Sequence, residues 1–124
     1  MDQMIQSLID ETNPSLIISF YPKFAVHPDH EATAEAVVRT VGRMHESDRP
    51  RLTLVAFSND ASEILGEPDI QNDITDFKEL KIKAFEAHAS QTGPFLKQLA
   101  SPEIDGKQHS FLTVEPYWTY HFKS

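Results

Sequence analysis

The sequence predicts an α/β fold, because two apolar runs of strand length flank one amphipathic helix. Residues 16–20 form the first run and residues 52–57 form the second. Uninterrupted apolar runs are typical of strands that are covered on both faces, as in parallel sheets. Between the two runs, a helix is expected to start after Asp29. Its buried side carries Ala34, Val37, Val38, Val41 and Met44 at helical spacing. The order strand, helix, strand predicts a β-α-β unit.

A second amphipathic helix is expected before this unit. Apolar residues recur at helical spacing along one face of residues 1–9, namely Met1, Met4, Ile5, Leu8 and Ile9. The Asn13-Pro14 pair should end the helix, because proline cannot continue the hydrogen-bond ladder. The chain therefore enters the β-α-β unit from a helix.

The part that follows the unit is expected to hold a helix and strands. Residues 58–68 are predicted to be a loop and residues 69–74 a short strand. A further helix, capped by Asp76, has Phe77, Leu80, Ala84 and His88 on its predicted inner face. Residues 111–114 and 117–122 are predicted strands because of their aromatic and β-branched content.

Composition narrows the class of protein. The length of 124 residues predicts a single domain over residues 1–124, and 40% hydrophobic residues exclude a disordered chain. A net charge of -8 argues against nucleic acid as a partner, since phosphates require a basic face. No cysteine is present, so disulfides and thiolate metal sites are excluded. No apolar stretch has the length of a membrane span, so we expect a cytoplasmic protein without a membrane partner.

The motif with the most chemical content is His27-Pro28-Asp29-His30, which lies between the first strand and the central helix. Pro28 fixes the turn, and Asp29 is expected to cap the helix. The helix dipole disfavours a protonated imidazole at a helix N-terminus, so His30 should be neutral and able to bind a metal. The strand-to-helix loop is also where open α/β sheets bind ligands. The spacing alone is more often found in solvated loop histidines than in a functional pair, but the intervening Pro-Asp and the flanking strand and helix favour a functional pair.

The residues around this motif resemble those of a known family. Residues 15–22 and 25–33 resemble the second half of the PIG-L/LmbE family of zinc-dependent N-deacetylases, which act on N-acetylglucosamine-type sugars. Residues 83–91 resemble the family's helix that ends in A-H-x-S-Q. Residues 117–122 resemble the tail of the deacetylases of bacillithiol biosynthesis. The resemblance implies a Rossmann-like, LmbE-type three-layer sandwich, of which this chain is a part.

The resemblance also implies a cofactor, a substrate and site residues. Zinc would activate a water molecule and polarise an amide carbonyl, and His30 would be one of its ligands. His27 would stabilise the oxyanion or protonate the departing amine, and Asp29 would hold His27 in its tautomer. His88 and Gln91 would line the sugar pocket, although a histidine on a helix is more often structural. The implied substrate is a small amino sugar, N-acetylglucosaminyl malate.

One departure from the family pattern affects all of these roles. The family opens with a strand that leads into H-P-D-D, which supplies two metal ligands and the general base, and no such motif occurs here. The resemblance thus implies the C-terminal portion of a deacetylase, with two zinc ligands expected from an N-terminal segment. We then expect self-association or docking with an N-terminal half. The alternative is a non-catalytic α/β piece that folds only on docking to a partner chain.

Overall fold

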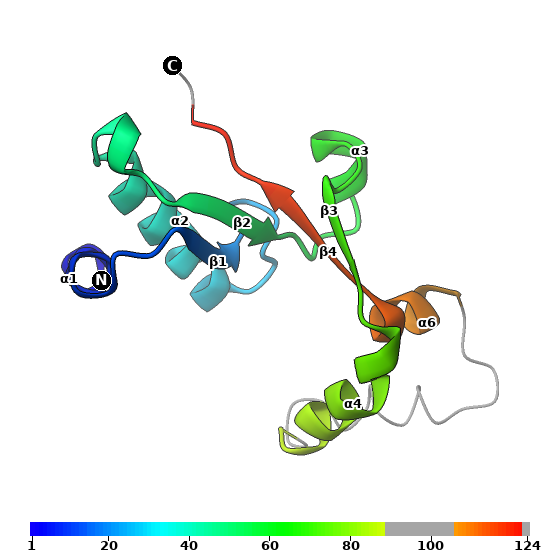
Figure 1. The fold of residues 1–124 in the computed structure, drawn as a ribbon. Helices are drawn as coiled ribbons and strands as arrows, with labels where there is room; N and C mark the ends of the chain where they lie inside the picture. Colours follow the sequence, from blue (N-terminus) through cyan, green and yellow to red (C-terminus); the bar gives the residue numbers. More distant parts are fainter. Residues whose placement is uncertain (89–105, 123–124) are drawn as a thin grey trace. The chain divides into compact units, whose positions relative to one another are not determined.

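The computed structural model describes residues 1–88 and 106–122, with residues 106–109 as backbone only. These residues form a mixed α/β structure with a four-stranded sheet (Figure 1). The chain divides into two compact units: unit 1 comprises Met1–Ile70 with Pro116–Ser124, and unit 2 comprises Gln71–Glu115. In chain order the helices and strands are α1 (Asp2–Thr12), β1 (Leu16–Phe20), α2 (Pro28–Gly42), β2 (Arg51–Val55), α3 (Ala61–Leu65), β3 (Ile70–Asp73), α4 (Lys78–Glu86), α6 (Gly106–Thr113) and β4 (Val114–Thr119).

The predicted β-α-β unit is confirmed. Strand β1 pairs in parallel with β2, from Leu16 opposite Arg51 to Phe20 opposite Val55. Strand β4 pairs antiparallel with the other side of β2, and the strand order is β1-β2-β4-β3. Within the described residues β1 is therefore an edge strand. The expectation that it is covered on both faces is wrong, since Ile18 is 61% exposed.

The core of unit 1 lies between α2 and the sheet. Val37 and Val41 of α2 pack against Leu52 and Leu54 of β2, as the helical spacing predicts. In α1 the predicted face is divided, because Ile9 is buried and Ile5 is partly buried, whereas Met1, Met4 and Leu8 are exposed. Asn13 ends α1 in the left-handed conformation, with φ of 46°, which asparagine tolerates better than most residues.

The C-terminal end of α2 is closed by an arginine. Arg49 donates from Nε to the carbonyl oxygens of Val41 and Met44, and from Nη2 to that of Gly42. Its guanidinium also lies 4.5 Å from the ring centroid of Phe122. A cation placed on unpaired carbonyls at a helix C-terminus satisfies the orphan acceptors and the helix dipole together.

Three predictions for the second half of the chain need correction. Residues 58–68 are not only loop, because α3 forms there. Residues 111–113 are helical rather than extended, as the last turn of α6. Asp76 does not cap the predicted helix; instead Asp73 accepts hydrogen bonds from the backbone N–H and the hydroxyl of Thr75 at a preceding 3-10 turn. These are local hydrogen-bond choices that hydrophobic spacing does not encode.

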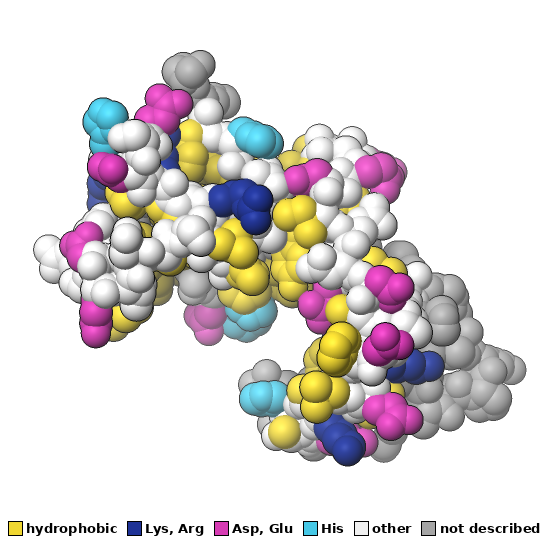
Figure 2. All heavy atoms as spheres, in the orientation of Figure 1, with side chains coloured by type: hydrophobic (Ala, Val, Ile, Leu, Met, Phe, Trp, Pro, Cys, Tyr) yellow, Lys and Arg dark blue, Asp and Glu magenta, His cyan; other side chains and the backbone are white. Residues whose placement is uncertain are grey.

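Unit 2 packs α4 on a different face from the predicted one. The Nζ of Lys81 bonds to the carbonyl oxygen of Phe111 and lies 4.0 Å from its ring centroid, and the Phe85 and Phe111 rings are 5.3 Å apart. Phe77 and Leu80, expected inside, are 59% and 65% exposed. Figure 2 shows hydrophobic side chains on the surface over α4. Phe77 and Leu80 line a shallow pocket of about 300 Å³ together with Ile74, Lys81, Ala84 and Glu115.

None of the helices in the described ranges combines the length and apolar character required to cross a membrane.

Candidate functional site

The His27–His30 motif occupies the loop and helix start that follow β1. Helix α2 begins at Pro28, and His27 is its N-cap, with the Nδ1 atom accepting the backbone N–H of Asp29 at 3.1 Å. The prediction that Asp29 caps the helix is therefore wrong, and the helix starts before this residue. Proline is favoured as the first helical residue, since its missing N–H would be unpaired there anyway. The His27 imidazole therefore caps the helix, a role that was expected of the Asp29 carboxylate.

This cap selects the tautomer of a neutral His27 ring. A ring nitrogen that accepts an N–H carries no proton, so a neutral His27 has its proton on Nε2. The Asp29 carboxylate lies 4.0 Å from Nδ1, beyond hydrogen-bond range, and its side chain is 92% exposed. In this arrangement the backbone of Asp29, not its carboxylate, orients the ring. The Nε2–H group remains as a donor on a side chain that is 60% exposed.

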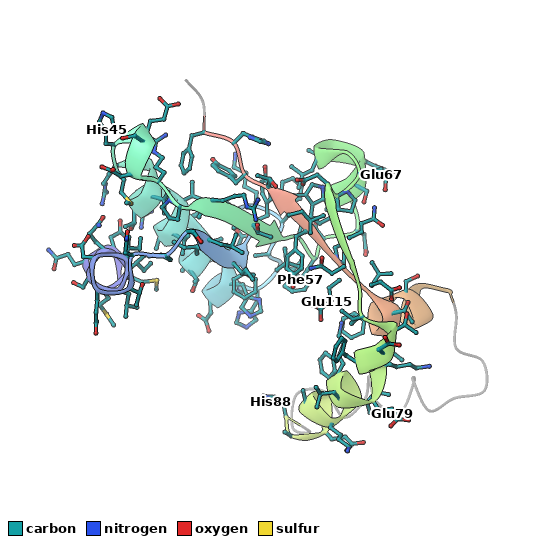
Figure 3. All side chains as sticks on the ribbon, viewed as in Figure 1. His45, Phe57, Glu67, Glu79, His88 and Glu115 are labelled. Carbon is teal, nitrogen blue, oxygen red and sulfur yellow. The ribbon has the colours of Figure 1, made fainter. Side chains whose placement is uncertain are left out.

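His30 is held by aromatic contacts. Its ring stacks on Phe20 at the end of β1, with centroids 4.3 Å apart and planes at 9°. Phe57, labelled in Figure 3 beyond the end of β2, lies 6.2 Å from the His30 ring. No residue in the described part of the chain forms a hydrogen bond with the His30 imidazole, which leaves its nitrogens available to a ligand. The His27 and His30 centroids are 5.1 Å apart, so the two rings form a pair.

The loop that leads to His27 is strained. Lys23 and Val26 both have φ of 74°, and Val26 is 70% exposed. The His27 N–H bonds to the Ala25 carbonyl oxygen at 2.9 Å, so Val26 is the centre of a three-residue γ-turn. Positive φ is rare for a β-branched residue, and such conformations cost about 1–3 kcal/mol each. The surrounding contacts must compensate for this cost.

Two sets of hydrogen bonds anchor this loop. The Glu31 carboxylate, from the first turn of α2, accepts the backbone N–H groups of Lys23 and Ala25, both at 2.8 Å. The Phe24 carbonyl oxygen accepts the N–H groups of Phe57 and Ser58 that follow β2. Sequence reasoning did not identify Glu31. The available signal was an acidic residue in the first helical turn, where a carboxylate can bind backbone N–H groups that precede the helix.

The residues present fit part of a zinc site. A catalytic zinc usually takes three protein ligands, and imidazole nitrogen is a common one. His30 meets that requirement through its available nitrogens and fixed ring, and His27 lies beside it. Over residues 1–88 and 106–122, however, no group of three His, Cys, Asp or Glu side chains is placed to hold a metal. The described part of the chain could therefore supply at most His30 and His27 to such a site, which is fewer than three ligands.

The structure describes one of the two predicted substrate-binding residues. His88 is exposed and follows the end of α4 in unit 2, where its backbone N–H bonds to the Phe85 carbonyl oxygen (Figure 3). It does not lie on a buried helix face, as the spacing had suggested. Gln91 lies outside the described residues. The predicted roles of both residues in sugar binding stay predictions.

Comparison with known proteins identifies relatives of this chain. It is 41% identical over 123 residues to a protein of Bacillus anthracis named probable N-acetyl-alpha-D-glucosaminyl L-malate deacetylase 2, with 98% of this chain and 54% of the relative covered. Proteins of the same name from Bacillus cereus and Bacillus subtilis are 42% and 38% identical over 118 and 119 residues, with 94% of this chain and 54% of each relative covered. No protein-family model and no solved structure matches the chain. The chain is thus similar to named deacetylases and spans about half the length of the curated relatives it matches.

Proposed function

We propose that this chain supplies part of the active site of a zinc-dependent deacetylase that acts on N-acetylglucosaminyl malate in bacillithiol biosynthesis. The observation that carries the proposal is the His27–His30 pair, in which one ring is fixed with available nitrogens and the other presents an Nε2–H donor. The similarity to proteins named for this deacetylation supports the choice of substrate. The parallel β1-α2-β2 unit supports placing it in a Rossmann-like, LmbE-type sandwich.

The proposed roles follow from the two environments. His30 is a zinc ligand, since its stacked ring is already oriented and no residue in the described part of the chain competes for its nitrogens by hydrogen bonding. Zinc, when bound, would polarise the acetyl carbonyl and activate a water molecule. His27 donates its Nε2–H to the carbonyl oxygen as negative charge develops there. Water oxygen bonds to the acetyl carbon, the carbon–nitrogen bond breaks, and the sugar amine leaves with a proton while acetate is released.

The remaining parts of the proposal lie beyond this pair. Pairing of the Asp29 carboxylate with His27 requires a side-chain rotation, because the atoms are 4.0 Å apart, and a proton on Nδ1 in place of the accepted backbone N–H. It stays a prediction. Two further zinc ligands and the general base are proposed to come from a segment that carries H-P-D-D. His88 and Gln91 are proposed to contact the sugar.

Separate substitutions of the two histidines test the proposal. The chain is combined with a polypeptide that carries the family's H-P-D-D segment, and zinc content and deacetylase kinetics are measured. His30→Ala should lose zinc and activity together. His27→Ala should keep zinc and KM while kcat falls about 10²- to 10³-fold, the usual cost of a lost oxyanion donor. His45→Ala is a matched control, since His45 also accepts a backbone N–H, from Ser47, at the start of a 3-10 turn beyond α2.

Two results would contradict this assignment. Equal zinc loss in His27→Ala and His30→Ala would show that the roles are not divided as proposed. A wild-type complex that assembles without zinc or activity would favour the alternative of a non-catalytic piece that docks on a partner. The chain alone should bind no stoichiometric zinc, because loss of even an indirect ligand contact typically costs ~10- to 100-fold in metal affinity.

A further inference from the structure

We propose that Glu31 is a positioning residue for His27, an inference that rests on the proposed function of that histidine. Glu31 does not face the His27 ring. It acts through the loop backbone, where each carboxylate oxygen accepts one N–H: Oε2 that of Lys23 and Oε1 that of Ala25. The residue that follows this braced segment is Val26, at the centre of the γ-turn, and His27 comes next.

The two hydrogen bonds that Glu31 accepts, here called the brace, connect two parts of the backbone that are fixed separately. From Pro28 onward the backbone is fixed by α2, and up to Phe24 it is fixed by bonds to the segment after β2. Val26 lies between these two fixed parts of the backbone and connects them with a φ of 74°, a conformation that valine rarely adopts. Glu31 links the two fixed ends, because it belongs to the helix and binds the loop. Without it, Val26 can relax to an ordinary φ and carry the N-cap imidazole with it.

Burial makes this brace difficult to replace. Ala25 is 1% exposed, so removal of the carboxylate leaves a part-buried N–H group without its acceptor. The same loop bonds through the Phe24 carbonyl oxygen to Phe57, whose ring lies beside His30. A loosened loop therefore affects the donor histidine first and the environment of the proposed ligand second.

The test compares three variants of the chain. Glu31→Ala removes both acceptors, Glu31→Gln retains one acceptor oxygen, and Glu35→Gln changes an exposed glutamate of the same helix as a matched control. Amide hydrogen exchange at Lys23 and Ala25 and the ring-nitrogen chemical shifts of His27 are measured by NMR. Zinc content, kcat and KM are measured after addition of the H-P-D-D polypeptide. Unchanged amide signals of Val41 and Leu54 show that the core of each variant is folded.

Glu31→Ala should speed exchange at Ala25 by roughly 2- to 10-fold, as expected for one lost hydrogen bond. The His27 shifts should move from a single Nε2–H tautomer towards a mixture. In the complex, kcat should fall about 10- to 100-fold with zinc and KM unchanged, because misplacement of a reacting group affects the chemical step. Glu31→Gln should lie between Glu31→Ala and wild type, and Glu35→Gln should match wild type.

The outcomes separate this inference from the proposed function. Unchanged His27 shifts and kcat in Glu31→Ala would overturn the positioning role, even if the loop amides exchange faster. A core that unfolds in Glu31→Ala while Glu31→Gln behaves as wild type would also overturn it. If the wild-type complex has no deacetylase activity, the proposed function fails, and the His27 shifts still decide whether Glu31 positions this side chain.

Discussion

Units 1 and 2 differ in how they use their apolar side chains. In unit 1, helix α2 and strand β2 enclose a continuous core that includes Val41 and Leu54, both 0% exposed. Among the described residues of unit 2, Leu112 is the buried hydrophobic one, while Phe77 and Leu80 lie mostly in solvent. Similar apolar spacing therefore leads to a buried helix face in unit 1 and to an exposed face in unit 2.

The candidate site lies in unit 1, the unit that holds the continuous core. His27 and His30 lie at the start of the helix that supplies Val37 and Val41 to that core, and Phe20 at the end of β1 supports the His30 ring. A strained turn such as that at Val26 can persist only where the neighbouring structure is firmly held. Unit 1 meets that condition, whereas the predicted residue His88 lies on an exposed segment of unit 2.

The largest expected difference between the units is the effect of truncating one leucine in each. Leu54→Ala removes a fully buried side chain and should reduce the free energy of unfolding by about 2–5 kcal/mol. Leu80→Ala should change it by no more than about 0.5 kcal/mol, as is usual for exposed positions. Urea unfolding followed by circular dichroism, and by Trp118 fluorescence for unit 1, measures both. Equal losses would mean that Leu80 is buried in solution, and the comparison would fail.

A smaller effect should come from the arginine that closes α2. Arg49→Ala removes three hydrogen bonds to carbonyl oxygens at and just beyond the C-terminal end of α2, together with the contact with Phe122, and should cost about 1–2 kcal/mol of unfolding free energy. Arg49→Lys keeps the charge but not the planar fork, so it should recover only part of the loss. Arg51→Ala, an exposed arginine nearby in the sequence, is the control. A loss of similar size in Arg51→Ala would indicate a general charge effect rather than a cap.

The smallest expected effect is a dependence of stability on acid. Two hydrogen bonds from the Arg39 guanidinium, with the nearby charges of Arg39 and Arg43, lower the pKa of Asp2 to about 2. The folded-state pKa lies below the ordinary value, so this contribution is present above about pH 4 and is lost as the pH falls towards 2. Asp2→Asn should be less stable than wild type above about pH 4, and this difference should shrink as the pH falls towards 2, as measured by urea unfolding between pH 2 and 6.

Asp73 provides the counterpart in unit 2. The hydroxyl and backbone N–H of Thr75 lower the pKa of Asp73, but these donors are only two residues away, whereas Asp2 joins α1 to α2. Asp73→Asn should therefore change global unfolding less than Asp2→Asn over the same pH range. The opposite ranking would show that local turns in unit 2 control the stability of the chain.

Hydrophobic spacing and one motif were sufficient to predict the β-α-β unit and the place of the candidate site. The bounds of β1 and the buried side of α2 follow from hydrophobic spacing, because one apolar stripe has one obvious partner in a parallel unit. The His27-Pro28-Asp29-His30 order was sufficient to locate a histidine pair at the strand-to-helix loop. Local sequence specifies these features, and the fold retains them.

Contacts between residues distant in the sequence set which groups bind the loop and which apolar faces are covered. Glu31 binds backbone N–H groups six and eight residues upstream, and the His27 ring rather than the Asp29 carboxylate caps α2. Hydrophobic spacing predicts neither of these contacts. Likewise α4 has two apolar faces, and contact with Phe111 selected the one that carries Phe85. Spacing shows that a face is apolar, but the partner that buries it comes from elsewhere in the chain.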